Sequence, residues 1–215
     1  MNALASAAGP DPRQRAQAWL AQACGGRVAI ERWERLSGGA IQENVALDVS
    51  IEGGPRAGRH EWVLRTDAPS AVAVSHTRPE EFEILRVAHA AGVLVPEPLL
   101  CCADGHGPDF FVMRRVPGVT AGHRLSKDDR LVPDRPALAR ELGENLARLH
   151  AVRPPAATLA FLGEPARDHA CATIAGYRRD LDALGAVRGE AWPALEWGLA
   201  WCARHAPPPL PACLL

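Results

Sequence analysis

The sequence contains almost no lysine. Of its 24 basic residues only Lys127 is a lysine, and the rest are arginine. Any task that proteins usually give to a lysine, such as neutralising a phosphate, would here fall to a guanidinium. The net charge is -1 and the sequence pI is about 6.7. Without a basic surface field, neither a nucleic acid nor an acidic membrane face is favoured as a partner.

The sequence also lacks metal-type cysteine patterns and long apolar runs. Its six cysteines form no C-x-x-C, and none stands at metal-ligand spacing from a histidine. We interpret them as reduced and mostly buried, and we expect no metal site within the chain. No run is long enough to cross a membrane, and residues 1–8 lack the positive charge and apolar length of a signal peptide. We therefore expect a cytoplasmic protein without a membrane partner.

The order of the periodic segments predicts an α+β fold. Apolar alternation and β-branched residues predict strands at 28–36, 45–51, 61–66, 99–103 and 110–113. Helical spacing predicts helices at 12–23, 79–91, 134–150, 167–184 and 190–205, with Asp134 as the N-cap of the third. These segments make a five-stranded antiparallel sheet with one inserted helix, followed by helices. We divide the chain into three parts: an N-terminal helix and lead-in (1–26), a sheet lobe (27–117) and a helical part (118–215).

A glycine pair lies between the first two predicted strands. Gly38 and Gly39 can adopt backbone angles closed to other residues, so that successive amide N–H groups, together with Ser37, can surround an anion such as a phosphate. A Gly-Gly pair between strands is also a common hairpin turn without any ligand. The pair alone leaves both interpretations open.

Several further segments together resemble a known family. They read L-S-G-G-A-I-Q-E-N, W-V-L-R-T-D-A-P-S, E-E-F-E-I-L-R, V-P-E-P-L, F-F-V-M and L-G-E-N-L-A-R-L-H-A. In this order, over residues 36–215, the chain resembles the aminoglycoside phosphotransferase-like family of small-molecule kinases, which has a protein kinase-like fold. The resemblance implies a bilobal molecule: a nucleotide-binding N-lobe, and here the first helices of an incomplete helical C-lobe. It also implies ATP and Mg²⁺ as cofactors.

The resemblance assigns a phosphate clamp to two charged residues. Arg65 stands on the third strand, where kinases carry a lysine that pairs with the nucleotide phosphates, and a guanidinium can grip phosphate bidentately. Glu81, on the inserted helix, would hold Arg65, with Glu80 as the second choice. The alternatives are that Arg65 is a surface charge at a strand end, and that both acids only complement the helix N-terminus.

Three residues near the end of the fifth strand would receive the adenine. The resemblance places Met113 at the back of the adenine pocket, while Arg114 and Val116 would offer backbone C=O and N–H groups to the base. Apolar residues such as Met113 are more often plain core residues of a strand.

The H-G-D-x-x-x-x-N loop that carries the family's catalytic aspartate does not occur in the sequence. We therefore expect no catalytic residue within the chain, with metal ligands beyond Leu215, and we interpret the chain as truncated or as a fragment. The implied function is ATP-dependent phosphorylation of a hydroxyl on an unknown small molecule. The alternative is a catalytically inactive nucleotide-binding or interaction module.

Overall fold

The computed structural model describes residues 11–36, 42–68, 75–118, 122–154 and 157–214. Within the chain two compact units are distinguished, Met1–Leu149 and His150–Leu215, and each is described by itself. The predicted division at 26 and 117 stays a prediction. Ser37, Gly38 and Gly39 lie outside the described residues.

The first unit is built on one antiparallel sheet of five strands, which the sequence predicted. Its spatial order is β1-β2-β3-β5-β4, and each neighbouring pair is antiparallel. This arrangement, with one helix inserted between β3 and β4 and further helices after β5, confirms the α+β fold class. The strands are β1 (Arg27–Arg35), β2 (Gln42–Glu52), β3 (Gly58–Asp67), β4 (Pro98–Cys102) and β5 (Phe110–Arg114).

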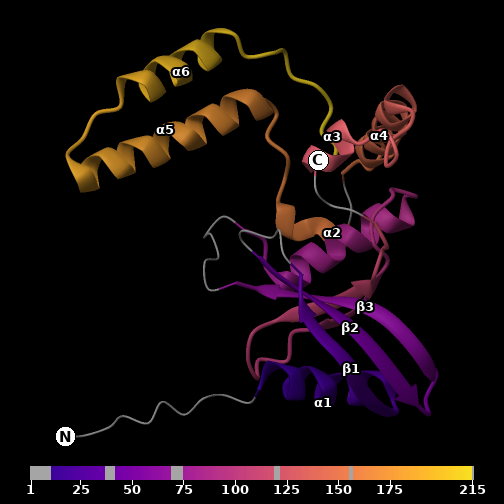
Figure 1. The fold of residues 1–215 in the computed structure, drawn as a ribbon. Coiled ribbons are helices and arrows are strands. Elements are labelled where there is room, and N and C mark those ends of the chain that lie inside the picture. Colours follow the sequence, from indigo (N-terminus) through magenta and orange to yellow (C-terminus); the bar gives the residue numbers. More distant parts are fainter. Residues whose placement is uncertain (1–10, 37–41, 69–74, 119–121, 155–156, 215) are drawn as a thin grey trace, which may run out of the picture. The chain divides into compact units, whose positions relative to one another are not determined.

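Two helices cover the opposite faces of this sheet (Figure 1). Because successive strand residues point to opposite faces, β3 sends Leu64 to one side and Val63 to the other. Leu64 belongs to the larger core beneath α1 (Pro12–Cys24), whereas Val63 packs in a smaller core with α2 (Arg78–Ala90). The smaller core contains Phe111 and Met113, in contact with Phe82 of α2.

Helix α1 also covers the backbone of the edge strand β1. Arg13 Nη2 donates to the Ile30 carbonyl at 2.6 Å, and Gln17 Oε1 accepts from the Ile30 N–H at 3.3 Å. An uncovered edge strand offers such groups to other chains, so these contacts protect the edge of the sheet. The helix ends at Gly25 with a φ of 63°, a left-handed conformation that glycine adopts without a Cβ penalty.

Two helices follow the sheet in the first unit. The predicted helix is α4 (Arg135–His150), and Asp134 caps it by accepting the Ala137 N–H at 2.8 Å. The short α3 (Gly122–Lys127) was not predicted. The leucine stripe of α4 is only partly covered, since Leu142 is 61% exposed.

The second unit contains a 3₁₀ turn and two helices, η1 (Ala157–Leu162), α5 (His169–Arg188) and α6 (Pro193–Arg204). The sequence predicted both helices but ended the first too early. Helix α5 runs on to Arg188 and stops at Gly189, which has a φ of 66°. The two helices lie side by side (Figure 1), and Arg178 forms an ion pair with Glu196 across them.

The cysteine prediction was partly wrong. All six cysteines are free as expected, but only Cys24 and Cys102 are buried, whereas Cys171 and Cys202 are exposed. The exposed pair stands on α5 and α6, neither of which contains a buried residue. Among the described residues, no helix combines the length and the apolar character needed to cross a membrane.

Candidate functional site

The C-terminal end of β3 presents a cation to the inserted helix. Arg65 follows Leu64, so its side chain points to the face that α2 covers. Its Nη2 atom lies 2.7 Å from Oε1 of Glu81, in the first turn of α2. Both side chains are about three-quarters shielded from solvent, at 25% and 20% exposure. The structure thus joins the two residues that the sequence assigned to a phosphate clamp.

Arg65 makes a second contact with the strand that follows the glycine pair. Its Nη2 atom also donates to Oε1 of Gln42, the first residue of β2. A guanidinium carries five N–H donors, so those on Nη1 and Nε lie outside these two contacts. The Nε atom is buried and has no hydrogen-bond partner among the described residues. A buried donor of this kind is satisfied when an acceptor such as a phosphate oxygen reaches it.

A second arginine holds Glu81 from its other side. Arg78, at the first position of α2, is 1% exposed and pairs through Nη1 with Oε2 of Glu81. Its Nη2 donates to the backbone carbonyl of His76 at 2.7 Å, and its Nε lies 3.1 Å from Oδ1 of Asp67. Asp67 is the last residue of β3.

The four charged side chains alternate in sign along a continuous row: Arg65, Glu81, Arg78 and Asp67. Only Arg78 in this row is buried, so removing one of its acidic partners would leave part of a buried charge uncompensated. The row therefore ties the start of α2 to the end of β3 and fixes Glu81 between two cations.

The neighbouring acid, Glu80, caps the N-terminus of α2. Its carboxylate accepts the Thr77 N–H at 2.8 Å, while the Thr77 hydroxyl accepts the Glu80 N–H, which completes a capping box. The Thr77 backbone hydrogen bond lowers the pKa of Glu80. Glu80 thus complements the helix N-terminus, and Glu81 is the acid that meets Arg65.

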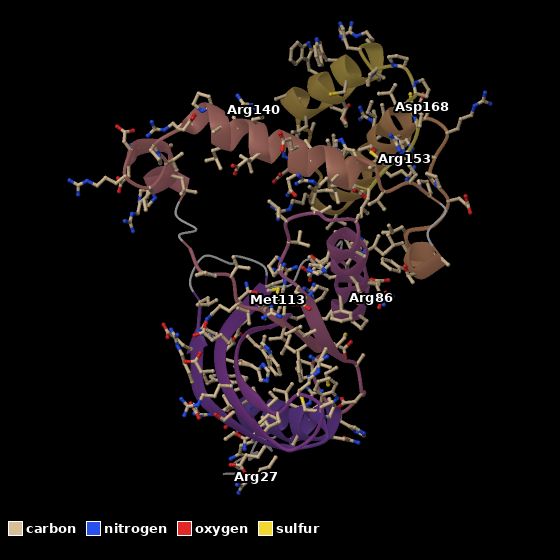
Figure 2. All side chains as sticks on the ribbon, turned by 90° about the vertical axis from the view of Figure 1, so that its right-hand side faces the viewer. Arg27, Arg86, Met113, Arg140, Arg153 and Asp168 are labelled. Carbon is tan, nitrogen blue, oxygen red and sulfur yellow. The ribbon has the colours of Figure 1, made fainter. Side chains whose placement is uncertain are left out.

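The predicted adenine-binding residues lie at the end of β5. Met113 is buried against α2, at the end of the sheet opposite to Arg27 (Figure 2). Arg114 is exposed, donates its backbone N–H to the Glu97 carbonyl at 2.8 Å, and pairs with the Glu97 carboxylate at 2.6 Å. Val116 is 63% exposed. Their predicted contacts to a base stay a prediction.

The residues that flank the glycine pair are placed close to this site. Leu36 donates its N–H to the Asn44 carbonyl at 2.8 Å, which closes the β1–β2 hairpin. Asn44 is the register partner of Arg65, and Gln42 touches the same guanidinium. The β2 residues that follow the glycine pair therefore lie beside Arg65.

No three His, Cys, Asp or Glu side chains gather around a common point within the part of the chain that the structure describes. At the Arg65 site the buried group without a partner among the described residues is a guanidinium N–H. Cationic donors bind anions, whereas Mg²⁺ requires oxygen ligands.

Sequence reasoning missed three members of the site. Gln42 follows the glycine loop directly, and Asp67 follows Arg65 by two residues, which places both on the same strands as the predicted residues. Arg78 carried a recognisable signal. A cation at the first position of a helix opposes the helix dipole, so another interaction must favour it there.

A five-stranded antiparallel sheet whose third strand presents a cation to a carboxylate on the inserted helix defines a kinase-like class of protein. The chain belongs to the phosphotransferase enzyme family (APH), whose family model matches residues 32–215. This match confirms the family that the sequence motifs indicated. No curated protein matches the chain.

Proposed function

We propose that the chain binds ATP as part of a phosphotransferase that phosphorylates a hydroxyl on a small molecule. The observation that carries this proposal is the Arg65–Glu81 pair, at 2.7 Å, in which Arg65 also contacts Gln42, a residue that follows the glycine pair closely in the sequence. The family match supports transfer of a phosphoryl group. ATP supplies that group, and a positioned cation neutralises charge on its phosphates.

The residues present fit a polyphosphate. Arg65 is held through Nη2 alone, which leaves its buried Nε–H without a partner among the described residues. Gly38 and Gly39 would add backbone N–H groups, and Glu81 would orient Arg65. Met113 and the backbone of Arg114 and Val116 would contact the base.

A nucleotide-binding or interaction module without catalysis is the second candidate. It is favoured by the absence of an H-G-D-x-x-x-x-N segment from the sequence and by exposed aromatic residues on α6. Trp197 is 67% exposed and Trp201 is 47% exposed. The two candidates differ in turnover. We expect the 215-residue chain alone to bind ATP without producing ADP, and steady ADP production would favour the catalytic candidate.

Thermal unfolding with MgATP tests the binding proposal. ATP at about 100 times its Kd should stabilise the wild-type chain by about 2.7 kcal/mol, because a ligand that binds only the folded state shifts the equilibrium by mass action. The Arg65→Ala variant should lose most of this stabilisation.

Arg27→Ala is the matched control, because Arg27 forms an exposed ion pair with Glu52 at the other end of the sheet (Figure 2). Its ATP response should equal that of the wild type. A wild-type chain that ATP does not stabilise would contradict the proposal. Phosphorylation of a small-molecule hydroxyl and a cytoplasmic location both stay predictions.

A further inference from the structure

Arg78 is the one polar or charged residue that is buried among those the structure describes. Burying a guanidinium is unfavourable unless its charge and its N–H donors are compensated. Its place at the start of α2 adds a second cost, since the helix dipole is positive at that end. Neither helix formation nor burial accounts for an arginine at this position.

The contacts of Arg78 all lead to the Arg65 site. One nitrogen pairs with Glu81, another lies 3.1 Å from Asp67 at the end of β3, and a third donates to the carbonyl of His76. Nη1 and Nη2 donate hydrogen bonds to Glu81 and His76 in the fixed plane of the guanidinium, whereas the Nε contact with Asp67 is an ion pair without a hydrogen bond. A lysine ammonium presents its donors from a single nitrogen.

Glu81 alone would weaken the site that it orients. A carboxylate next to Arg65 cancels the charge of that guanidinium and would repel a phosphate. Arg78 supplies a second cation to the same carboxylate. It pairs with Oε2, whereas Arg65 pairs with Oε1. Because Asp67, the partner on the far side, is 47% exposed, its charge is screened more strongly by solvent.

We propose that Arg78 is a positioning residue of the nucleotide site: it fixes and neutralises Glu81, so that Arg65 is oriented and keeps its charge for phosphate before any ligand arrives. This inference rests on the proposed function. Arg78 acts through Glu81 and Arg65, and at 1% exposure it does not touch the nucleotide itself. Asp67 supports the same arrangement from β3.

Titration calorimetry of the full chain with MgATP tests this role. Arg78→Lys keeps the charge but not the three simultaneous contacts, and we expect its affinity to fall about tenfold. Arg15→Lys is the matched control, since Arg15 is also shielded, at 13% side-chain exposure, and binds both Asp104 and a backbone carbonyl. It should lower the melting temperature as Arg78→Lys does, yet leave the affinity within about twofold of the wild type.

The double variant Arg65→Ala with Arg78→Lys separates positioning from general destabilisation. If Arg78 acts through Arg65, the double variant should bind no more weakly than Arg65→Ala alone, because the effects of coupled residues do not add. Wild-type affinity in Arg78→Lys, or losses that add fully, would overturn the inference.

Asp67→Asn decides the question if Arg78→Lys does not fold, because it retains Arg78 and alters an accessible carboxylate. We expect it to weaken binding about threefold, and an unchanged affinity would overturn the inference.

Failure of the proposed function gives a different result. In that case neither the wild type nor any variant binds MgATP, whereas failure of this inference alone leaves wild-type binding and its dependence on Arg65 intact.

Discussion

At the scale of single residues, the proposed phosphate clamp depends on Arg65 being an arginine and not a lysine. Arg65 contacts Gln42 and Glu81 through the same nitrogen, Nη2. A lysine has one nitrogen with three donors, and two such contacts would occupy most of them. The guanidinium retains its other donors while both partners are bound, so under the proposed function they are left for a phosphate in a chain with a single lysine.

The ion pair between Arg15 and Asp104 gives a pH-dependent prediction. The backbone N–H of His106 and the Arg15 guanidinium hold the pKa of Asp104 at about 2, below its usual 3.8. A carboxyl whose folded-state pKa is depressed contributes stability above its unfolded pKa and loses it as the pH falls through the folded value. The stability gap between the wild type and Asp104→Asn should therefore be widest above about pH 4.

Urea unfolding at a series of pH values measures that gap. It should narrow steadily as the pH falls from about 4 to about 2, where Asp104 becomes protonated in the wild type. A gap that is independent of pH over this interval would contradict the assignment.

The residue pairings show where sequence reasoning reaches and where it stops. The meeting of Arg65 with Glu81 was predicted, because the family resemblance implied such a pair and the inward stripe of the helix favoured Glu81. The contact of Gln42 with Arg65 was not, since it depends on the register between β2 and β3. Arg78 was missed because its burial depends on Asp67 and Glu81 lying on either side of it.

At the scale of elements, the start of α2 carries both a cap and part of the site. Thr77 accepts the Glu80 N–H in the capping box, and Glu81 and Arg78 stand in the same turn. Thr77→Ala should lower the free energy of unfolding by about 1 kcal/mol, since it leaves a helix N–H without its acceptor. Thr77→Ser should restore most of that loss, because serine caps equally well.

Chemical denaturation of the three proteins measures the effect of the cap. The Thr77→Ala chain should also bind MgATP more weakly than the Thr77→Ser chain, because fraying of this turn releases Glu81. Equal stability of Thr77→Ala and the wild type would show that the cap does not hold the helix.

Element boundaries were predicted less well than element types. The sequence began the third strand at 61, whereas β3 begins at Gly58, because pairing with β2 extends through Ile51. Pairing partners distant in the sequence set strand ends, and no local pattern encodes them. The unpredicted η1 and α3 are short elements with little periodicity of their own.

At the scale of the whole molecule, burial is distributed unevenly. Strands β2 and β3 together contain eight buried hydrophobic residues, including Leu47 and Leu64, whereas α5 and α6 contain no buried residue. Segments with few buried contacts open locally at a low free energy. Hydrogen exchange should therefore protect the amides of β2 and β3 most strongly, and those of α5 and α6 much less.

Hydrogen-exchange mass spectrometry of the intact chain checks this order. Amides in α5 should exchange at least about tenfold faster than those in the centre of β3, since a difference of 1.4 kcal/mol in opening free energy is enough. Protection of α5 equal to that of β3 would contradict the burial that the structure gives these helices.

The central claim is that Arg65 binds the phosphates of ATP. Side-chain NMR of the arginine Nε–H groups tests it most directly, with the Arg65 signal assigned by its absence from the Arg65→Lys spectrum. The Arg65 Nε–H has no partner among the described residues, so its signal should shift progressively and saturate as ATP is added. The Arg27 signal should stay in place. An Arg65 signal that does not move at saturating ATP would contradict the claim.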